Sequence, residues 1–184
     1  MKGLVLPEDW EIEAAVPEYV DGQGDCTRLM LADGTERLLP VRLRTLLERL
    51  ARRHCQSLPL LRAWAKERTA LCQSAPLAMG AELVLVPFQA RRPRFKGDGA
   101  MGVVNAAHVR LRQEKGRTAL ELSSGRFLCA LWGEATLAAH LRAAHLLRRE
   151  LEAGIDAAVL RRLFWRKAWE SGGTGGGKAV LGRK

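Results

Sequence analysis

The sequence lacks long apolar runs, paired cysteines and clustered histidines, and each absence excludes a class of protein. No stretch of about eighteen consecutive apolar residues occurs, so we expect no membrane-spanning helix. The first residues, MKGLVLPEDWEIE, turn acidic early and lack the apolar core of a signal peptide. The cysteines form no C-x-x-C pair; they are Cys26, Cys55, Cys72 and Cys129. We therefore expect a cytoplasmic protein with reduced, mostly buried thiols.

The histidines give no signal for a metal site. His140 and His145 are five residues apart on a predicted helix, about 140° around its axis, so they cannot share a ligand face. His54 and His108 have no ligand-like neighbours. A Cys/His nucleophile pair stays open, because such partners can lie far apart in sequence, but no pattern supports one. We predict no metal, no cofactor and no catalytic activity.

The charge balance points to polyanionic partners. Thirty Lys and Arg residues against twenty Asp and Glu residues give a net charge of +10. Most of the excess is Arg, whose planar fork matches phosphates and base edges. We therefore expect nucleic acid as the partner. A basic protein-interaction module that serves acidic partners is an alternative.

Turns and apolar spacing predict an α+β fold of β-hairpins and short sheets with packed helices. Residues 1–16 predict an irregular or short-strand lead-in. Hairpins are predicted at Asp33-Gly34 and at Ser124-Gly125. Further strands are predicted over 81–88 and, as a strand or strand pair, over 102–113. Helices are predicted over 41–55, 60–72, 134–151 and 155–169.

Residues 89–117 carry the densest positive charge, with eight Lys or Arg residues and two acidic ones. Pro93 keeps the cationic run extended and out of a helix. An extended Arg-rich loop can follow a phosphate backbone or enter a groove of DNA. The predicted backbone and groove contacts are Arg91, Arg92, Arg94 and Lys96. The alternative is a solvated, flexible hairpin loop.

The strand behind this loop supplies four further candidates. Arg110 and Arg112 alternate along it, so they should share one face and contact phosphates. Asn105 and His108 are candidates for polar contacts with base edges.

Gly97–Gly102 fits the pattern G-x-G-x-x-G, which suggests a nucleotide-dependent enzyme as a rival function. The dinucleotide-binding form of this motif follows a strand directly and opens a helix. Here a cationic run precedes the glycines, and a β-branched, strand-like segment follows them. We interpret the glycines as the flexible tip of a basic hairpin. Gly172–Lys178 fits a P-loop pattern, but Ala179 replaces the required Ser or Thr.

An internal similarity bears on domain organisation. Residues 27–54 align without gaps on residues 118–145, and both segments predict a hairpin followed by a helix. The similarity indicates either a duplication or a chance match of Leu- and Gly-containing units. We divide the chain into an N-terminal half (1–75), a β-rich DNA-binding half with terminal helices (76–170) and a disordered Gly-rich tail (171–184).

Short motifs in order along the chain resemble the competence transcription factor family, ComK, from about residue 17 to about residue 151. The N-terminal matches are Asp21-Gly22, Cys26, the helix entry Pro40–Leu47 and Cys55. The central matches are LVLVPFQAR, Val104-Asn105, His108-Val109, and the hairpin residues Leu122, Ser124 and Gly125. The second half also resembles LytTR DNA-binding domains through Val104-Asn105, His108-Val109 and Leu122–Gly125.

The resemblance implies a transcription factor of the competence, or DNA-uptake, type that binds duplex DNA. It implies AT-rich sites read in the minor groove, and binding as a homodimer or higher oligomer. The sequence departs from the ComK pattern at Gly102-Val103-Val104, where that family tends to carry Trp-Ile. Its C-terminal end matches no motif for a proteolytic adaptor, so regulation by an adaptor is not implied.

Overall fold

The computed structural model describes residues 5–71, 73–93, 99–114 and 117–172, and for 156–172 it describes the backbone alone. Within these residues the chain forms three α-helices and two antiparallel sheets, so the predicted α+β class is confirmed. The chain divides into two compact units, residues 1–149 and residues 150–184. Both sheets belong to the first unit.

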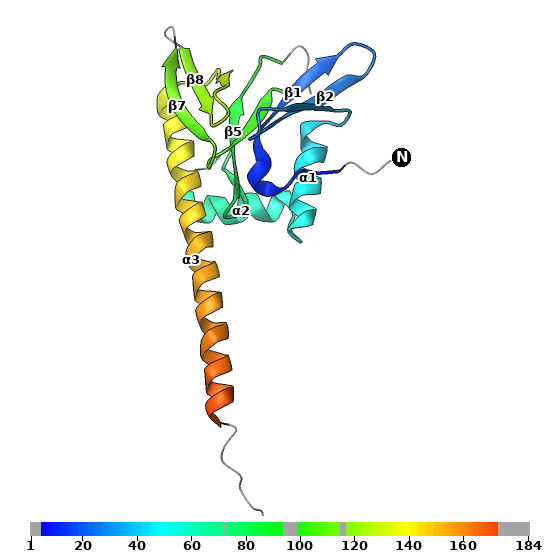
Figure 1. Cartoon of the computed structure of the whole chain (residues 1–184). Coiled ribbons are helices and arrows are strands. Elements are labelled where there is room, and N and C mark those ends of the chain that lie inside the picture. The colour runs from blue at the N-terminus through cyan, green and yellow to red at the C-terminus, as the bar shows by residue number, and fades with distance from the viewer. Residues whose placement is uncertain (1–4, 72, 94–98, 115–116, 173–184) are drawn as a thin grey trace, which may run out of the picture. The chain divides into compact units, whose positions relative to one another are not determined.

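Strand β1 occupies the centre of the larger sheet, which has the order β3-β2-β1-β6-β5-β4, while the smaller sheet has the order β7-β8-β9. The elements, drawn in Figure 1, are η1 (Asp9–Glu11), β1 (Ile12–Val20), β2 (Gly24–Leu31), β3 (Glu36–Leu39), α1 (Leu43–Arg53), α2 (Leu58–Thr69), β4 (Leu77–Gly80), β5 (Leu83–Gln89), β6 (Met101–Asn105), β7 (Val109–Glu114), β8 (Arg117–Leu122), β9 (Phe127–Cys129) and α3 (Glu134–Gly172). The larger sheet thus takes strands from both sides of residue 75. The predicted boundary there does not separate two compact units.

Both faces of the larger sheet carry buried side chains along the first half of β1 and along β5 and β6, where successive residues point to opposite faces. Leu29, Leu83 and Leu85 point to the face that α1 and α2 cover, where Leu46 and Leu50 pack on them. The side chains of the opposite face are also buried; they include Ala14, Val84, Val86, Phe88 and Val104. The apolar stripe predicted for 41–55 therefore forms part of the main core.

The smaller sheet lies beside the first turns of α3 (Figure 1), and Gln113 of β7 donates a hydrogen bond to Glu134 at the start of that helix. Helical spacing puts four apolar residues on one buried stripe: Leu137, Leu141, Ala144 and Leu147. The core face of β8 contributes the buried Leu120 and Leu122.

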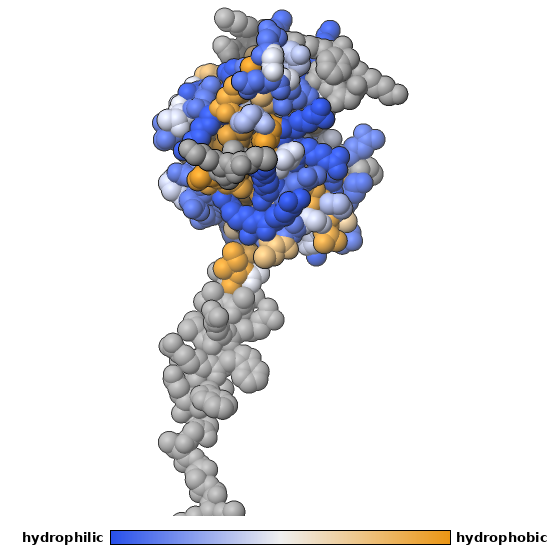
Figure 2. All heavy atoms as spheres, turned by 90° about the vertical axis from the view of Figure 1, so that its right-hand side faces the viewer, coloured by the Kyte–Doolittle hydropathy of each residue, from blue (hydrophilic) through white to orange (hydrophobic). Residues whose placement is uncertain are grey.

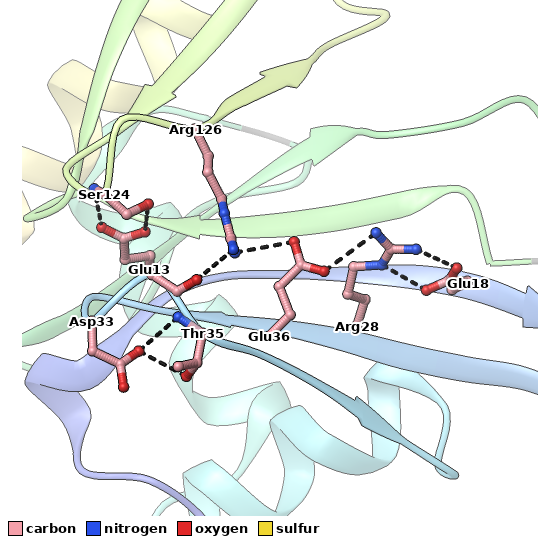
Figure 3. A network of polar contacts seen from close by, with 9 residues as sticks. Glu13, Glu18, Arg28, Asp33, Thr35, Glu36, Ser124 and Arg126 are labelled. Atoms are coloured by element: carbon pink, nitrogen blue, oxygen red, sulfur yellow. Dashed lines mark hydrogen bonds and ion pairs between the residues drawn. The ribbon is translucent and has the colours of Figure 1, made fainter.

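A buried carboxylate joins the smaller sheet to the larger one. Glu13 of β1 is completely buried and accepts hydrogen bonds from the backbone N–H and hydroxyl of Ser124, at 2.8 and 2.6 Å. Arg126 donates to the carbonyl of Gly34 and pairs with Glu36 at 3.0 Å. As Figure 3 shows, these contacts hold the β8–β9 turn against the β2–β3 hairpin.

The same polar network continues along β1 and β2. Arg28 pairs with Glu36 at 3.4 Å and donates two hydrogen bonds to Glu18 (Figure 3). The hydrogen bonds from Arg28 lower the pKa of the Glu18 carboxyl below its ordinary value.

The structure corrects several predicted boundaries. The lead-in contains β1, which is a long central strand from Ile12 onward. The segment 102–113, predicted as a strand or strand pair, is a pair of strands that belong to different sheets and separate after Asn105. The two predicted C-terminal helices are the single helix α3, which includes the first two residues of the predicted tail. Helix α2 begins at Leu58, because a proline fits the first helical turn.

The internal similarity corresponds to matching local structure. Both aligned segments form a hairpin and then a helix, as predicted. In each turn a leucine N–H donates to the residue four positions later, and a glycine N–H donates back to that leucine. These residues are Leu31, Gly34 and Thr35 in the first segment, and Leu122, Gly125 and Arg126 in the second. The two glycines have φ values of +82° and +83°, which favour glycine.

Gly102, the last glycine of the G-x-G-x-x-G pattern, lies inside β6 and faces an aromatic ring. A Cβ at this position would meet the Phe88 ring at 3.0 Å and Val16 at 3.1 Å. By contrast, a Cβ at Gly99 would meet nothing closer than Pro17, at 3.7 Å. Gly102 is therefore required by packing against Phe88.

We expect Gly102→Ala to destabilise the protein by about 1–3 kcal/mol, because the added methyl group overpacks a filled core. Gly99→Ala is the matched control and should change stability by less than about 0.5 kcal/mol. Urea unfolding followed by circular dichroism measures both. Equal stability of the two variants would contradict the packing role of Gly102.

Candidate nucleic-acid interface

Arg91 closes the base of the basic loop. Its guanidinium donates to the carbonyl of Gly99 at 2.7 Å and to the Asp25 carboxylate at 3.0 Å. The backbone N–H groups of Ala90 and Arg91 both donate to Ala100. Only 20 % of the Arg91 side chain is exposed. Arg91 therefore holds the two ends of the loop together, and Asp25 compensates its charge.

Arg92 is exposed and lines a hollow of about 530 Å³ together with Arg117 and Trp132. Among the described residues, neither arginine has an acidic side chain within ion-pair distance. Arg94 and Lys96 lie outside the described residues, so their predicted contacts stay predictions.

Asn105 has a structural role, which corrects its assignment as a base contact. Its side chain is completely buried at the end of β6. The amide nitrogen donates to the carbonyls of Ile12, at 3.1 Å, and Glu82, at 2.9 Å. The amide oxygen accepts from the N–H of Ala107 at 3.2 Å. Asn105 cannot reach a base edge without leaving the core.

His108 and Arg110 line neither of the hollows that contain residues beside the loop base, and Arg112 lies further along β7. The strand β7 has six residues, or about 20 Å at the usual rise, and His108 precedes it at the end opposite the β7–β8 connection. His108 and Arg110 line a separate hollow of about 340 Å³ beside Glu121. Arg112 donates to Glu121 at 2.7 Å, so its charge is compensated.

Three arginines that sequence reasoning assigned to core helices lie at the loop base. Arg42, Arg44 and Arg62 line a hollow of about 570 Å³, and Asp25 and Gly99 line it with them. The sequence signal was their position off the apolar stripe, but nothing in it placed them near residue 99. Figure 2 views the molecule from the right-hand side of Figure 1, where hydrophilic side chains cover much of the first unit around separate apolar patches.

Each hollow includes a residue next to Arg91. Its partner Asp25 lines the larger hollow, and its sequence neighbour Arg92 lines the smaller one. Among the described lining residues of both hollows, five are arginines and Asp25 alone is acidic. We call the arginines of the two hollows, together with Arg91, the loop-end surface; they are Arg42, Arg44, Arg62, Arg91, Arg92 and Arg117. Its charge and hollowed form suit a chain of phosphates.

The structure also bears on the alternative function, a nucleotide-dependent enzyme built on the glycine pattern Gly97–Gly102. Gly102 leads into strand residues, so the described part of the pattern opens no helix N-terminus for a pyrophosphate. Among the described residues, no group of three His, Cys, Asp or Glu side chains could hold a metal ion. No described helix is long and apolar enough to cross a membrane.

We expect Asn105→Leu to destabilise the protein by about 2–4 kcal/mol, because it leaves two buried carbonyls and one N–H without partners. Gln113→Leu replaces an exposed amide and should cost less than about 1 kcal/mol. Thermal unfolding compares the two. An Asn105→Leu protein that keeps its stability but loses DNA binding would restore the base-contact assignment.

No family model matches this chain, and no curated protein or solved structure matches it either. The ComK and LytTR likenesses therefore remain predictions from short motifs, and a functional proposal has to rest on the charge and geometry of the loop-end surface.

Proposed function

We propose that the protein is a DNA-binding transcription factor that binds duplex DNA through its loop-end surface. One observation carries this proposal: two hollows beside the base of a basic loop are lined by five arginines and one acid. Arginine forms bidentate hydrogen bonds with phosphate, and several such contacts in a row select a polyanionic chain over single anions.

The arginines divide into positioning and contacting groups. Arg91 is held by Asp25 and shapes the loop base, so it acts through the loop. Arg42 lies at the approach to α1, Arg44 on α1 and Arg62 on α2, and all three are exposed, so they can reach phosphates. Arg44 also pairs with Glu48 at 3.0 Å, and Arg42 lies 4.0 Å from Asp25. Arg92 and Arg117 supply the second group of contacts. Arg110 and His108 fit a separate contact at the far end of β7.

The proposed type of regulator and its DNA site follow from the motif resemblance to the ComK family. A competence-type regulator would read AT-rich sites in the minor groove, where a narrow groove concentrates negative potential and attracts arginine. An Arg-rich loop on a rigid sheet suits that geometry, because its closed base limits the entropy lost on binding. Binding as a homodimer or higher oligomer belongs to the same proposal.

The test is DNA affinity across a salt series for two variants with equal charge change. Arg42→Gln/Arg117→Gln removes one cation from each hollow. Arg37→Gln/Arg142→Gln removes two exposed arginines that line neither hollow. Each lost phosphate contact lowers the slope of log K against log salt by about 0.9. We therefore expect a drop of about 2 for the first variant and little change for the second.

Fluorescence anisotropy on one AT-rich and one GC-rich duplex of equal length provides the measurement. Equal weakening by both variants would show that only net charge matters and would overturn the loop-end assignment. Equal affinity for the two duplexes would overturn the AT-rich minor-groove reading and leave duplex binding in place. Binding to acidic proteins without binding to DNA would favour the protein-interaction alternative.

A further inference from the structure

Trp132 is held in position within the smaller hollow by contacts on both sides. Just before it, the N–H of Ala130 donates to Thr118 at 3.1 Å, and the N–H of Leu131 donates to Gln89 at 2.9 Å. Just after it, α3 begins at Glu134. The His140 ring packs against the indole with 5.0 Å between the ring centroids. The indole is thus ordered without a ligand.

The hollow combines this indole with positive charge. Arg92 and Arg117 line it, and no acidic residue is among its described lining residues. Its volume of about 530 Å³ is in the range of small-ligand sites. Leu131, which is half-exposed, adds apolar surface next to the indole. An indole beside two guanidinium groups suits a planar ring that carries a phosphate.

We propose that this hollow binds one unpaired nucleobase and its phosphate, with Trp132 stacking on the base and Arg92 and Arg117 contacting the phosphate. The inference rests on the proposed DNA-binding function and extends it to unstacked nucleotides. In a paired duplex both faces of a base are covered by its neighbours, so only an unstacked base can reach an indole. Basic grooves with aromatic platforms are the usual solution for binding single strands.

Cysteine footprinting tests this site on the intact protein. The exposed thiol of Cys129 lines the same hollow, whereas the exposed thiol of Cys55 lines none of the described hollows. The probe is a twelve-nucleotide oligothymidylate, and mass spectrometry follows alkylation of both thiols by a maleimide. We expect the oligonucleotide to slow alkylation of Cys129 by about fivefold or more and to leave Cys55 unchanged, as for a base that occupies the hollow.

Variants assign the protection to the indole. Trp132→Leu should abolish the protection of Cys129 and weaken oligonucleotide binding about tenfold, the loss typical of one stacked base. Trp132→Phe keeps an aromatic face and should retain most of the protection. Trp10→Leu removes an exposed tryptophan outside the hollow and is the matched control. Arg117→Gln tests the phosphate contact at an exposed side chain and does not disturb the Trp132–His140 pair.

Parallel titration with a fully paired duplex separates the two proposals. The protein can bind the duplex while the oligonucleotide either fails to protect Cys129 or protects it equally in Trp132→Leu. Either result overturns the nucleobase site and leaves the proposed function standing. Protection that depends on Trp132, without duplex binding, overturns the duplex function and keeps the hollow as a single-strand site. Failure of both measurements overturns both proposals.

Discussion

The buried carboxylate of Glu13 is the contact on which the arrangement of the two sheets depends. A carboxylate in the core without partners costs several kcal/mol, and the Ser124 N–H and hydroxyl are the partners that it has. The β8–β9 turn must therefore sit over β1. Once the turn is fixed, β9 and the segment that follows it are fixed as well. Trp132 and Arg117 come together at the far end of this strand pair, so the smaller hollow depends on a contact about a strand length away.

Charge compensation explains why the candidate surface differs from the most basic stretch of sequence. An arginine whose charge is matched by a nearby carboxylate adds less attraction for a polyanion, and Arg91 and Arg112 are matched by Asp25 and Glu121. In the larger hollow Arg44 is likewise paired with Glu48, at 3.0 Å. Arginines on α1 and α2 come close to the loop base only through the fold. The candidate surface is thus shaped by the positions of acidic side chains as much as by the positions of basic ones. A count of cations along the sequence cannot show this.

Turn residues and apolar spacing predicted the hairpins and helix α1. Contacts between residues far apart in sequence determined the features that the sequence did not predict. The Asp33-Gly34 and Ser124-Gly125 turns need positive φ, and the α1 stripe has helical spacing, so both could be read directly. Strand β1 was predicted only as an irregular or short-strand lead-in, because Glu13 and Pro17 break its apolar pattern, and the reason for a buried glutamate lies 111 residues away at Ser124. Asn105 looked like an exposed polar residue behind a basic loop. Its partners Ile12 and Glu82 are remote in sequence, so only the fold reveals its burial.

The two hollows occupy corresponding places in the two hairpin–helix segments. The larger hollow lies where β2 and α1 begin, at Asp25 and Arg42, and the smaller one lies where β8 and α3 begin, at Arg117 and Gly133. Unpaired N–H groups at a helix start favour anions, so each segment offers a similar framework for a phosphate. The side chains then differ: the first framework carries arginines on helices, and the second carries an indole. One local architecture used twice would thereby provide a backbone contact at one hollow and a base contact at the other.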